Sequence, residues 1–382
     1  MKIQYKLLQL FPLFLFYFPT LRVGGIPFRF EDLLCVTFFI SALFFGTQGV
    51  KKKQASAWVA YWLMIAILTV SAIYYSSMLN IKSWIIGVSF AKYLLWYFVI
   101  SKVSSSISRD GFRDGLVKVL KICFYLQFII LIFQKFNILG FASGVPFHFV
   151  VKFYSIPNIY ATTTDIEALI STHMNFAFRP AGTFGSSTVT GISMYIVGSL
   201  ISLYYGKVYY KLLGYLAAFI CFSKIAIVAA IFCDFILPVI IKFRVRTFMI
   251  SVASFPILLL AGYFLMDFLG VMHNLQGALD GTDRGVTHRL AVTEYMFDMH
   301  WFELFFGNLG PLPFGFFDSG TLLSIFRYGL LFYMLEYAVL YLMFFSFSKK
   351  KLYSVSLVAL VFFADLTFGS VFNPVFSSMI LF

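Results

Sequence analysis

The sequence predicts an all-α, polytopic integral membrane protein with about 10–12 transmembrane helices. Two observations support this fold class. Of the 382 residues, 61% are hydrophobic and only 12% are charged, and the mean hydropathy is +0.89. No soluble domain could bury so much apolar surface. In addition, the basic residues gather in short clusters between apolar segments, as the positive-inside rule requires of a membrane protein.

The excess of positive charge is interpreted as topological. A net charge of +13 suits nucleic-acid binding, but its placement between apolar segments indicates membrane orientation instead, so no nucleic-acid partner is expected. The cysteines all lie in apolar stretches and show no C-x-x-C spacing, which predicts neither a disulfide framework nor a metal site. They are Cys35, Cys123, Cys221 and Cys233.

The first part of the chain is expected to cross the membrane five times. Lys2 and Lys6 precede the first apolar run, and no small-residue cleavage pattern follows it, so this run is interpreted as a retained helix. Basic clusters at Lys51 to Lys53 and between Lys102 and Lys121 mark the cytoplasmic side. The predicted helices cover about residues 7–21, 33–45, 57–76, 84–100 and 119–136.

A long outer loop, residues 137–186, follows the fifth helix. So long a loop between transmembrane helices is often functional. Arg179, Gly182 and Gly185 stand near its end, just before a sixth helix over about residues 187–207. The glycines permit turns that aim N–H groups at a ligand, the helix start adds unpaired donors, and the guanidinium fits phosphate oxygens in pairs. We therefore expect an anion site, or else a simple turn and helix cap.

The next apolar stretch, residues 212–241, is interrupted by Ser223 and Lys224 and closed by basic residues. A single crossing would place those basic residues outside, so two short helices are predicted, each below the ~20 residues of a full crossing. The turn between them would form the floor of a cavity open to the outside. Lys224 would face into it, because an ammonium in lipid is costly, or would snorkel to the interface.

The C-terminal part begins with a ninth helix over about residues 248–269 and a second long outer loop, residues 270–317, rich in titratable groups. A tenth helix over about residues 319–345 carries Arg327 in its outer third. An eleventh begins near residue 353 and is broken at Asp365, which leaves a twelfth helix and the side of the C-terminus open. We predict one transmembrane domain, residues 1–382, with two functional outer loops.

Several short motifs, in one order along the chain, resemble the O-antigen polymerase and O-antigen ligase superfamily. Asp318 stands where ligases usually carry a His-Asn pair, and Lys224 replaces an arginine; both departures favour polymerase over ligase. The motifs are Arg179 with Gly182-Thr183-Phe184, then Ser223-Lys224, His288-Arg289, Phe306-Gly307-Asn308-Leu309-Gly310, Asp318-Ser319-Gly320-Thr321-Leu322 and Tyr328-Gly329.

This resemblance implies a fold like that of GT-C-type glycosyltransferases, and a metal-independent polysaccharide polymerase without cofactors. The enzyme would lie in the bacterial inner (cytoplasmic) membrane, among membrane lipid, with its active site facing the periplasm. It would join undecaprenyl pyrophosphate-linked repeat units, as donor and acceptor, into O-antigen or a capsule-like polysaccharide. A chain-length regulator protein is an additional partner that the resemblance allows. The alternatives are a ligase that transfers glycan to lipid A-core and, from another class, a lipid-linked oligosaccharide flippase.

The resemblance also suggests roles for particular residues. Cations would stabilise the pyrophosphate leaving group in place of a metal, and an outer-loop group would deprotonate the acceptor hydroxyl. Asp318 and His288 are the candidate bases, with Glu294 behind them, although Asp318 could equally be the N-cap of the tenth helix. Catalytic roles are expected for Arg179, His288, Arg289 and Asp318. Pyrophosphate contacts are expected from Arg179, Gly182, Thr183, Lys224, Arg284 and Arg327.

Overall fold

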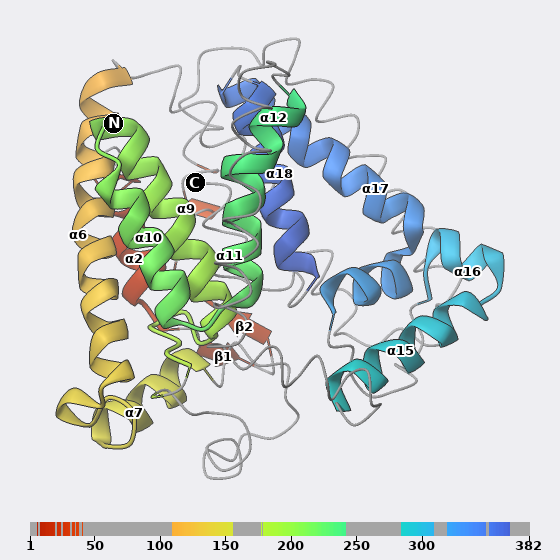
Figure 1. Cartoon of the computed structure of the whole chain (residues 1–382), viewed down its shortest axis with the longest axis horizontal. Helices are drawn as coiled ribbons and strands as arrows, with labels where there is room; N and C mark the ends of the chain where they lie inside the picture. The colour runs from red at the N-terminus through yellow and green to blue at the C-terminus, as the bar shows by residue number, and fades with distance from the viewer. Residues whose placement is uncertain are drawn as a thin grey trace. The chain divides into compact units, whose positions relative to one another are not determined.

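The computed structural model describes residues 6, 8–19, 21–23, 26–30, 33–34, 36–37, 40, 109–155, 177, 179–241, 284–308, 319–348 and 351–366. Helices dominate this part of the chain (Figure 1). Four of them are long and apolar enough to cross a membrane: Gly111–Lys135, Ser187–Tyr205, Lys224–Ile241 and Gly320–Phe345. The chain is therefore a helical membrane protein, as predicted. The predicted helices over residues 57–76, 84–100 and 248–269 lie outside the described residues.

Contacts divide the chain into two compact units, each assembled from separate stretches of sequence. The first contains Met1–Lys52, Ile81–Ile227 and Ser370–Phe382, and the second contains Lys53–Asn80 and Val228–Gly369. The prediction of one transmembrane domain stays a prediction. The two units are described in turn.

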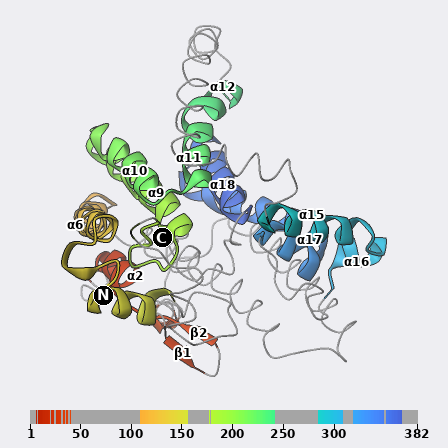
Figure 2. The same ribbon diagram turned by 60° about the horizontal axis from the view of Figure 1, so that its bottom comes forward.

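The first unit is built around a helical hairpin, α9 (Ser187–Tyr205) and α10 (Tyr209–Ile220), which lie side by side in Figures 1 and 2. Gly206 ends α9 in the left-handed conformation and turns the chain. A Cβ atom on Gly198 would lie 2.6 Å from the carbonyl oxygen of Tyr210, and one on Gly214 would lie 2.9 Å from that of Met194. These glycines therefore let the two backbones touch, as small residues do where membrane helices pack.

Helix α6 (Arg109–Lys135) packs beside this hairpin and begins ten residues before the predicted start at residue 119. Its first turns carry the basic cluster, whose charges find partners on neighbouring elements. Arg113 and Lys121 each lie 5.1 Å from a ring centroid on α9, those of Tyr204 and Tyr205. Because these cations rest on aromatic faces, the helix can continue through a polar segment that composition alone would exclude.

The N-terminal segment packs against α6 through α2 (Phe11–Tyr17). The chain then forms a small antiparallel hairpin of β1 (Leu21–Val23) and β2 (Ile26–Phe28), in which Leu21 pairs with Phe28. Buried Arg29 explains the early end of α2, because its Nη2 donates to the carbonyl oxygen of Leu15 at 2.8 Å. The hairpin occupies the predicted polar turn and is a small exception to the all-α prediction.

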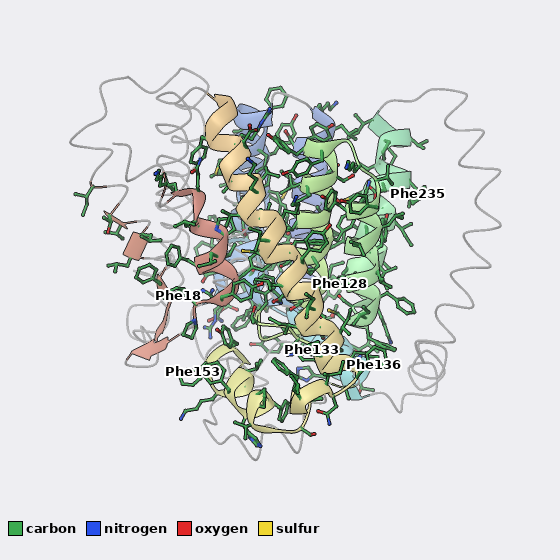
Figure 3. All side chains as sticks on the ribbon, turned by 90° about the vertical axis from the view of Figure 1, so that its left-hand side faces the viewer. Phe18, Phe128, Phe133, Phe136, Phe153 and Phe235 are labelled. Atoms are coloured by element: carbon green, nitrogen blue, oxygen red, sulfur yellow. The ribbon has the colours of Figure 1, made fainter. Side chains whose placement is uncertain are left out.

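The first part of the predicted outer loop is helical. It contains η2 (Ile138–Gly140), α7 (Val145–Val150) and a π-helical turn, η3 (Val151–Ser155). Phe136, Leu139 and Val145 are 72%, 75% and 83% exposed, so this end of the unit presents apolar side chains outward. Phe128, Phe133 and Phe136 line the same end of α6 in Figure 3.

In the second unit, η5 (Phe232–Ile236) continues directly into α12 (Leu237–Ile241), and both pack against α18 (Lys351–Asp365). Helix α18 forms a hairpin with α17 (Gly320–Ser348) and ends at Asp365, where a break was predicted. Two helices within the predicted second loop, α15 (Arg284–Phe297) and α16 (Trp301–Phe306), pack against α17 (Figure 1).

Candidate functional site

Residues 179–186, which lead into α9, are folded into the first unit rather than open to solvent. Arg179 is exposed, whereas the residues from Pro180 to Gly185 are buried. Gln134 of α6 holds the segment, because its Oε1 accepts the N–H groups of Ala181 at 3.0 Å and Gly182 at 2.8 Å. The hydroxyl of Thr183 donates to the carbonyl oxygen of Phe16 on α2. This segment is therefore tied to two other helices by polar groups that would be costly to bury unpaired.

Gly182 meets two requirements that no other residue satisfies. Its φ is +57°, in the left-handed region that side chains disfavour. A Cβ atom there would also lie 2.0 Å from Nε2 of Gln127 on α6. The close approach brings Gln127 within reach of Thr183, where Oε1 and the hydroxyl are 3.0 Å apart.

These contacts correct the expected roles of Gly182 and Thr183. Both were expected to contact a pyrophosphate, but the N–H of Gly182 and the hydroxyl of Thr183 already bond within the protein. Helix α9 does begin at Ser187, as predicted, although Ser186 makes no capping bond with its side chain. Gly182 and Thr183 thus shape the segment, and Arg179 is the member of this motif left exposed for a ligand.

The predicted helix break at Ser223 and Lys224 is present, and it lies against the start of α9. Helix α10 ends at Ile220, and α11 (Lys224–Ile231) begins after a three-residue turn. A Cβ atom on Gly191 of α9 would lie 2.6 Å from the Cβ atom of Ser223. The hydroxyl of Ser223 accepts the N–H of Ala226 at 3.4 Å, so this serine caps α11. Lys224, half-buried, is the residue of the pair available for another role.

Lys135 is a third cation at this end of the unit, and sequence analysis missed it. Its Nζ lies 4.3 Å from the ring centroid of Phe222, in the turn between α10 and α11. Phe222 itself has a φ of +51°, a conformation that non-glycine residues rarely adopt and that is found at functional sites. The available signal was the position of Lys135 as the last basic residue of an apolar helix.

The candidate residues of the second unit lie on and beside α17. Arg284, His288 and Arg289 lie on α15, with Arg284 and His288 one helical turn apart. The side chain of His288 is half-buried, while those of Arg284 and Arg289 lie outside the described residues. Arg327 is half-buried on α17, with its guanidinium carbon 5.6 Å from the ring centroid of Phe326.

Helices α16 and α17 touch backbone to backbone beside Arg327. Gly329 breaks α17, with φ +84° and ψ 163°, and Gly307 has a φ of +88°. A Cβ atom on Gly307 would lie 2.4 Å from the carbonyl oxygen of Arg327, and one on Gly329 would lie 2.1 Å from that of Phe305. The N–H of Asn308 donates to the carbonyl oxygen of Phe326 at 2.6 Å. Only glycine permits this crossing.

Ser319 is the N-cap of α17. Its hydroxyl accepts the N–H of Leu322 at 3.4 Å, directly before the helix begins at Gly320. Asp318 lies outside the described residues, but the capping role that was its alternative is filled by its neighbour.

The predicted site residues therefore form two groups. Arg179 and Lys224 belong to the first unit, with Lys135 added, whereas Arg284, His288, Arg289 and Arg327 belong to the second. Their convergence on one pyrophosphate stays a prediction. Comparison of the chain with protein-family models, with curated proteins and with solved structures gave no match.

Proposed function

We propose that this membrane protein polymerises undecaprenyl pyrophosphate-linked oligosaccharide repeat units into O-antigen or a capsule-like polysaccharide at the periplasmic face of the inner membrane. One observation carries the proposal: short motifs that are far apart in the sequence meet in pairs. The segment after Arg179 leads into the helix on which Ser223 rests. In the second unit, Gly307 and Gly329 bring their two motifs into backbone contact. Motifs that occur by chance would not be expected to pair in this way.

The chemistry asks for positive charge and for a base. Breaking the sugar–pyrophosphate bond develops negative charge on the leaving phosphate, which cations stabilise if they are fixed beforehand. Arg179, Lys135 and Lys224 lie around the start of α9 and supply such charge. Arg179 is suited to pair with two phosphate oxygens at once. Asp318 or His288 would take the proton of the acceptor hydroxyl as it attacks.

Deletion of the gene in its host tests the proposed reaction against its alternatives. We expect lipid A-core that carries a single repeat unit, because ligation continues when polymerisation stops. A silver-stained lipopolysaccharide gel measures this outcome. Loss of every repeat unit would contradict the proposal and favour a ligase or a flippase, and a persisting ladder would exclude a role in chain growth.

A further inference from the structure

Buried carboxyl and hydroxyl groups form a chain of contacts between α17 and α18, apart from the residues assigned to glycan transfer. Tyr337 donates its hydroxyl to Oδ2 of Asp365 at 2.5 Å. The hydroxyls of Tyr337 and Tyr333 are 3.0 Å apart, and those of Tyr333 and Thr321 are also 3.0 Å apart. Thr321 is the second residue of α17, so the chain runs from the helix start to the end of α18.

The direction of these hydrogen bonds is fixed by the carboxylate. Asp365 accepts from Tyr337, whose single proton is then used, so Tyr337 must accept from Tyr333. By the same reasoning Tyr333 accepts from Thr321. Every hydroxyl therefore donates toward Asp365, the arrangement along which a proton can pass from one oxygen to the next.

Glu336 supplies a second buried carboxyl group at the end of this chain. It is 3% exposed, and neither carboxylate oxygen has a hydrogen-bond partner among the described residues. It interacts electrostatically with Asp365, which is 1% exposed. An ionised carboxylate buried without partners costs several kcal/mol, and a second negative charge nearby adds to the cost. The pair therefore calls for a bound cation, and the smallest is a proton.

We propose that Asp365 and Glu336 form a buried proton-binding site, and that Thr321, Tyr333 and Tyr337 conduct protons between this site and the start of α17. In uptake, each hydroxyl receives one proton and passes one on, and the carboxyl pair gains one proton in total. Glu336 holds the resident proton, because Asp365 already accepts a hydrogen bond in its ionised form. This inference does not depend on the proposed glycan chemistry.

The surroundings leave this pair to itself among the described residues. On η5, which packs against α18, Cys233 contacts the carbonyl oxygen of Ser356 and Asp234 is half-buried. Helix α12 carries no ionisable side chain. The ionisable groups of α15 and α16 belong to helices that contact α17 around the break at Gly329, at Phe326 and Arg327. The charged residues of those two helices are Arg284, His288, Arg289, Glu294 and Glu303, with Asp298 and His300 between them.

Infrared spectroscopy of the full-length protein in lipid nanodiscs tests the site. We expect the carbonyl stretch of a protonated carboxylic acid at neutral pH, shifted after transfer to D₂O. Glu336→Gln should remove that band, whereas Asp298→Asn, at an exposed carboxyl on the second loop, should leave it. Absence of the band in the unmodified protein, or its persistence in Glu336→Gln, would overturn the proposal.

The conducting chain has its own test, which does not require loss of a carboxyl group. Tyr333→Phe keeps the ring and removes the hydroxyl, so the band should remain. Its shift in D₂O should slow by about tenfold or more, because exchange then depends on local opening. Tyr353→Phe, on α18 outside the chain, serves as the control. An unchanged exchange rate in Tyr333→Phe would show that protons reach Glu336 by another route.

Discussion

At the scale of single residues, two buried glutamines decide what the segment before α9 can do. Gln134 and Gln127 lie on α6, an apolar helix, and satisfy the backbone and hydroxyl groups of a segment some fifty positions later. The sequence shows the glycines and hydroxyls of that segment, and these predict an anion site as readily as a buried turn. It does not show that a glutamine from another helix consumes their donors. Only Arg179 keeps the predicted availability.

Gly182→Ala tests this packing. The substitution forces a side chain into a left-handed conformation and against Nε2 of Gln127, so we expect a loss of stability of about 1–3 kcal/mol. Gly111→Ala is the matched control, because a Cβ atom there meets nothing within 4 Å. It should be neutral or stabilise by up to ~1 kcal/mol, since alanine is the better helix former. Thermal unfolding in detergent measures both, and an equally stable Gly182→Ala protein would contradict the described packing.

The exposed arginine carries a prediction about chemistry. Arg179→Lys keeps the charge but loses the planar fork, so polymerisation should fall almost as far as in Arg179→Ala. The length of the polysaccharide ladder is the readout, with protein level in the membrane fraction as the control. A normal ladder from Arg179→Lys would show that charge alone suffices.

At the scale of helices and loops, hydrophobic pattern and charge predicted the interruptions well and the boundaries less well. The breaks at Ser223-Lys224 and at Asp365 follow from polar residues that cannot continue an apolar helix into lipid. The early start of α6 was missed because cation–aromatic contacts with α9 support its charged turns. The break at Gly329 was missed because it arises from backbone contact with α16, and one sequence position cannot reveal its distant neighbour.

The start of α17 separates a base from a helix cap. Because Ser319 caps the helix, Ser319→Ala should lower stability by about 1 kcal/mol and leave polymerisation largely intact. Asp318→Asn should do the opposite if Asp318 is the base, because asparagine cannot take up a proton. Unfolding temperatures and polysaccharide ladders of the two variants give the comparison. A full-length ladder from Asp318→Asn would remove Asp318 from the mechanism and make His288 the next residue to test.

At the scale of the whole molecule, the orientation in the membrane is a prediction from the basic clusters. Single cysteines at Lys52, Lys207 and Lys350 should resist a membrane-impermeant thiol reagent in spheroplasts, whereas cysteines at Thr163 and Asp283 should react. The background is low, because Cys123, Cys221 and Cys233 are buried, and Cys35 can be replaced by serine. Labelling at Lys207, in the turn between α9 and α10, would invert the first unit and contradict the predicted orientation.

Reconstitution of the purified protein tests the proposed polymerase activity most directly. The full-length chain is placed in liposomes with undecaprenyl pyrophosphate-linked repeat units and a metal chelator, and product length is followed by gel and mass spectrometry. We expect glycans of several repeat units still linked to the lipid carrier, formed by the unmodified protein and nearly absent with Arg179→Lys. Products no longer than one repeat unit, from a folded protein in sealed liposomes, would contradict a polymerase.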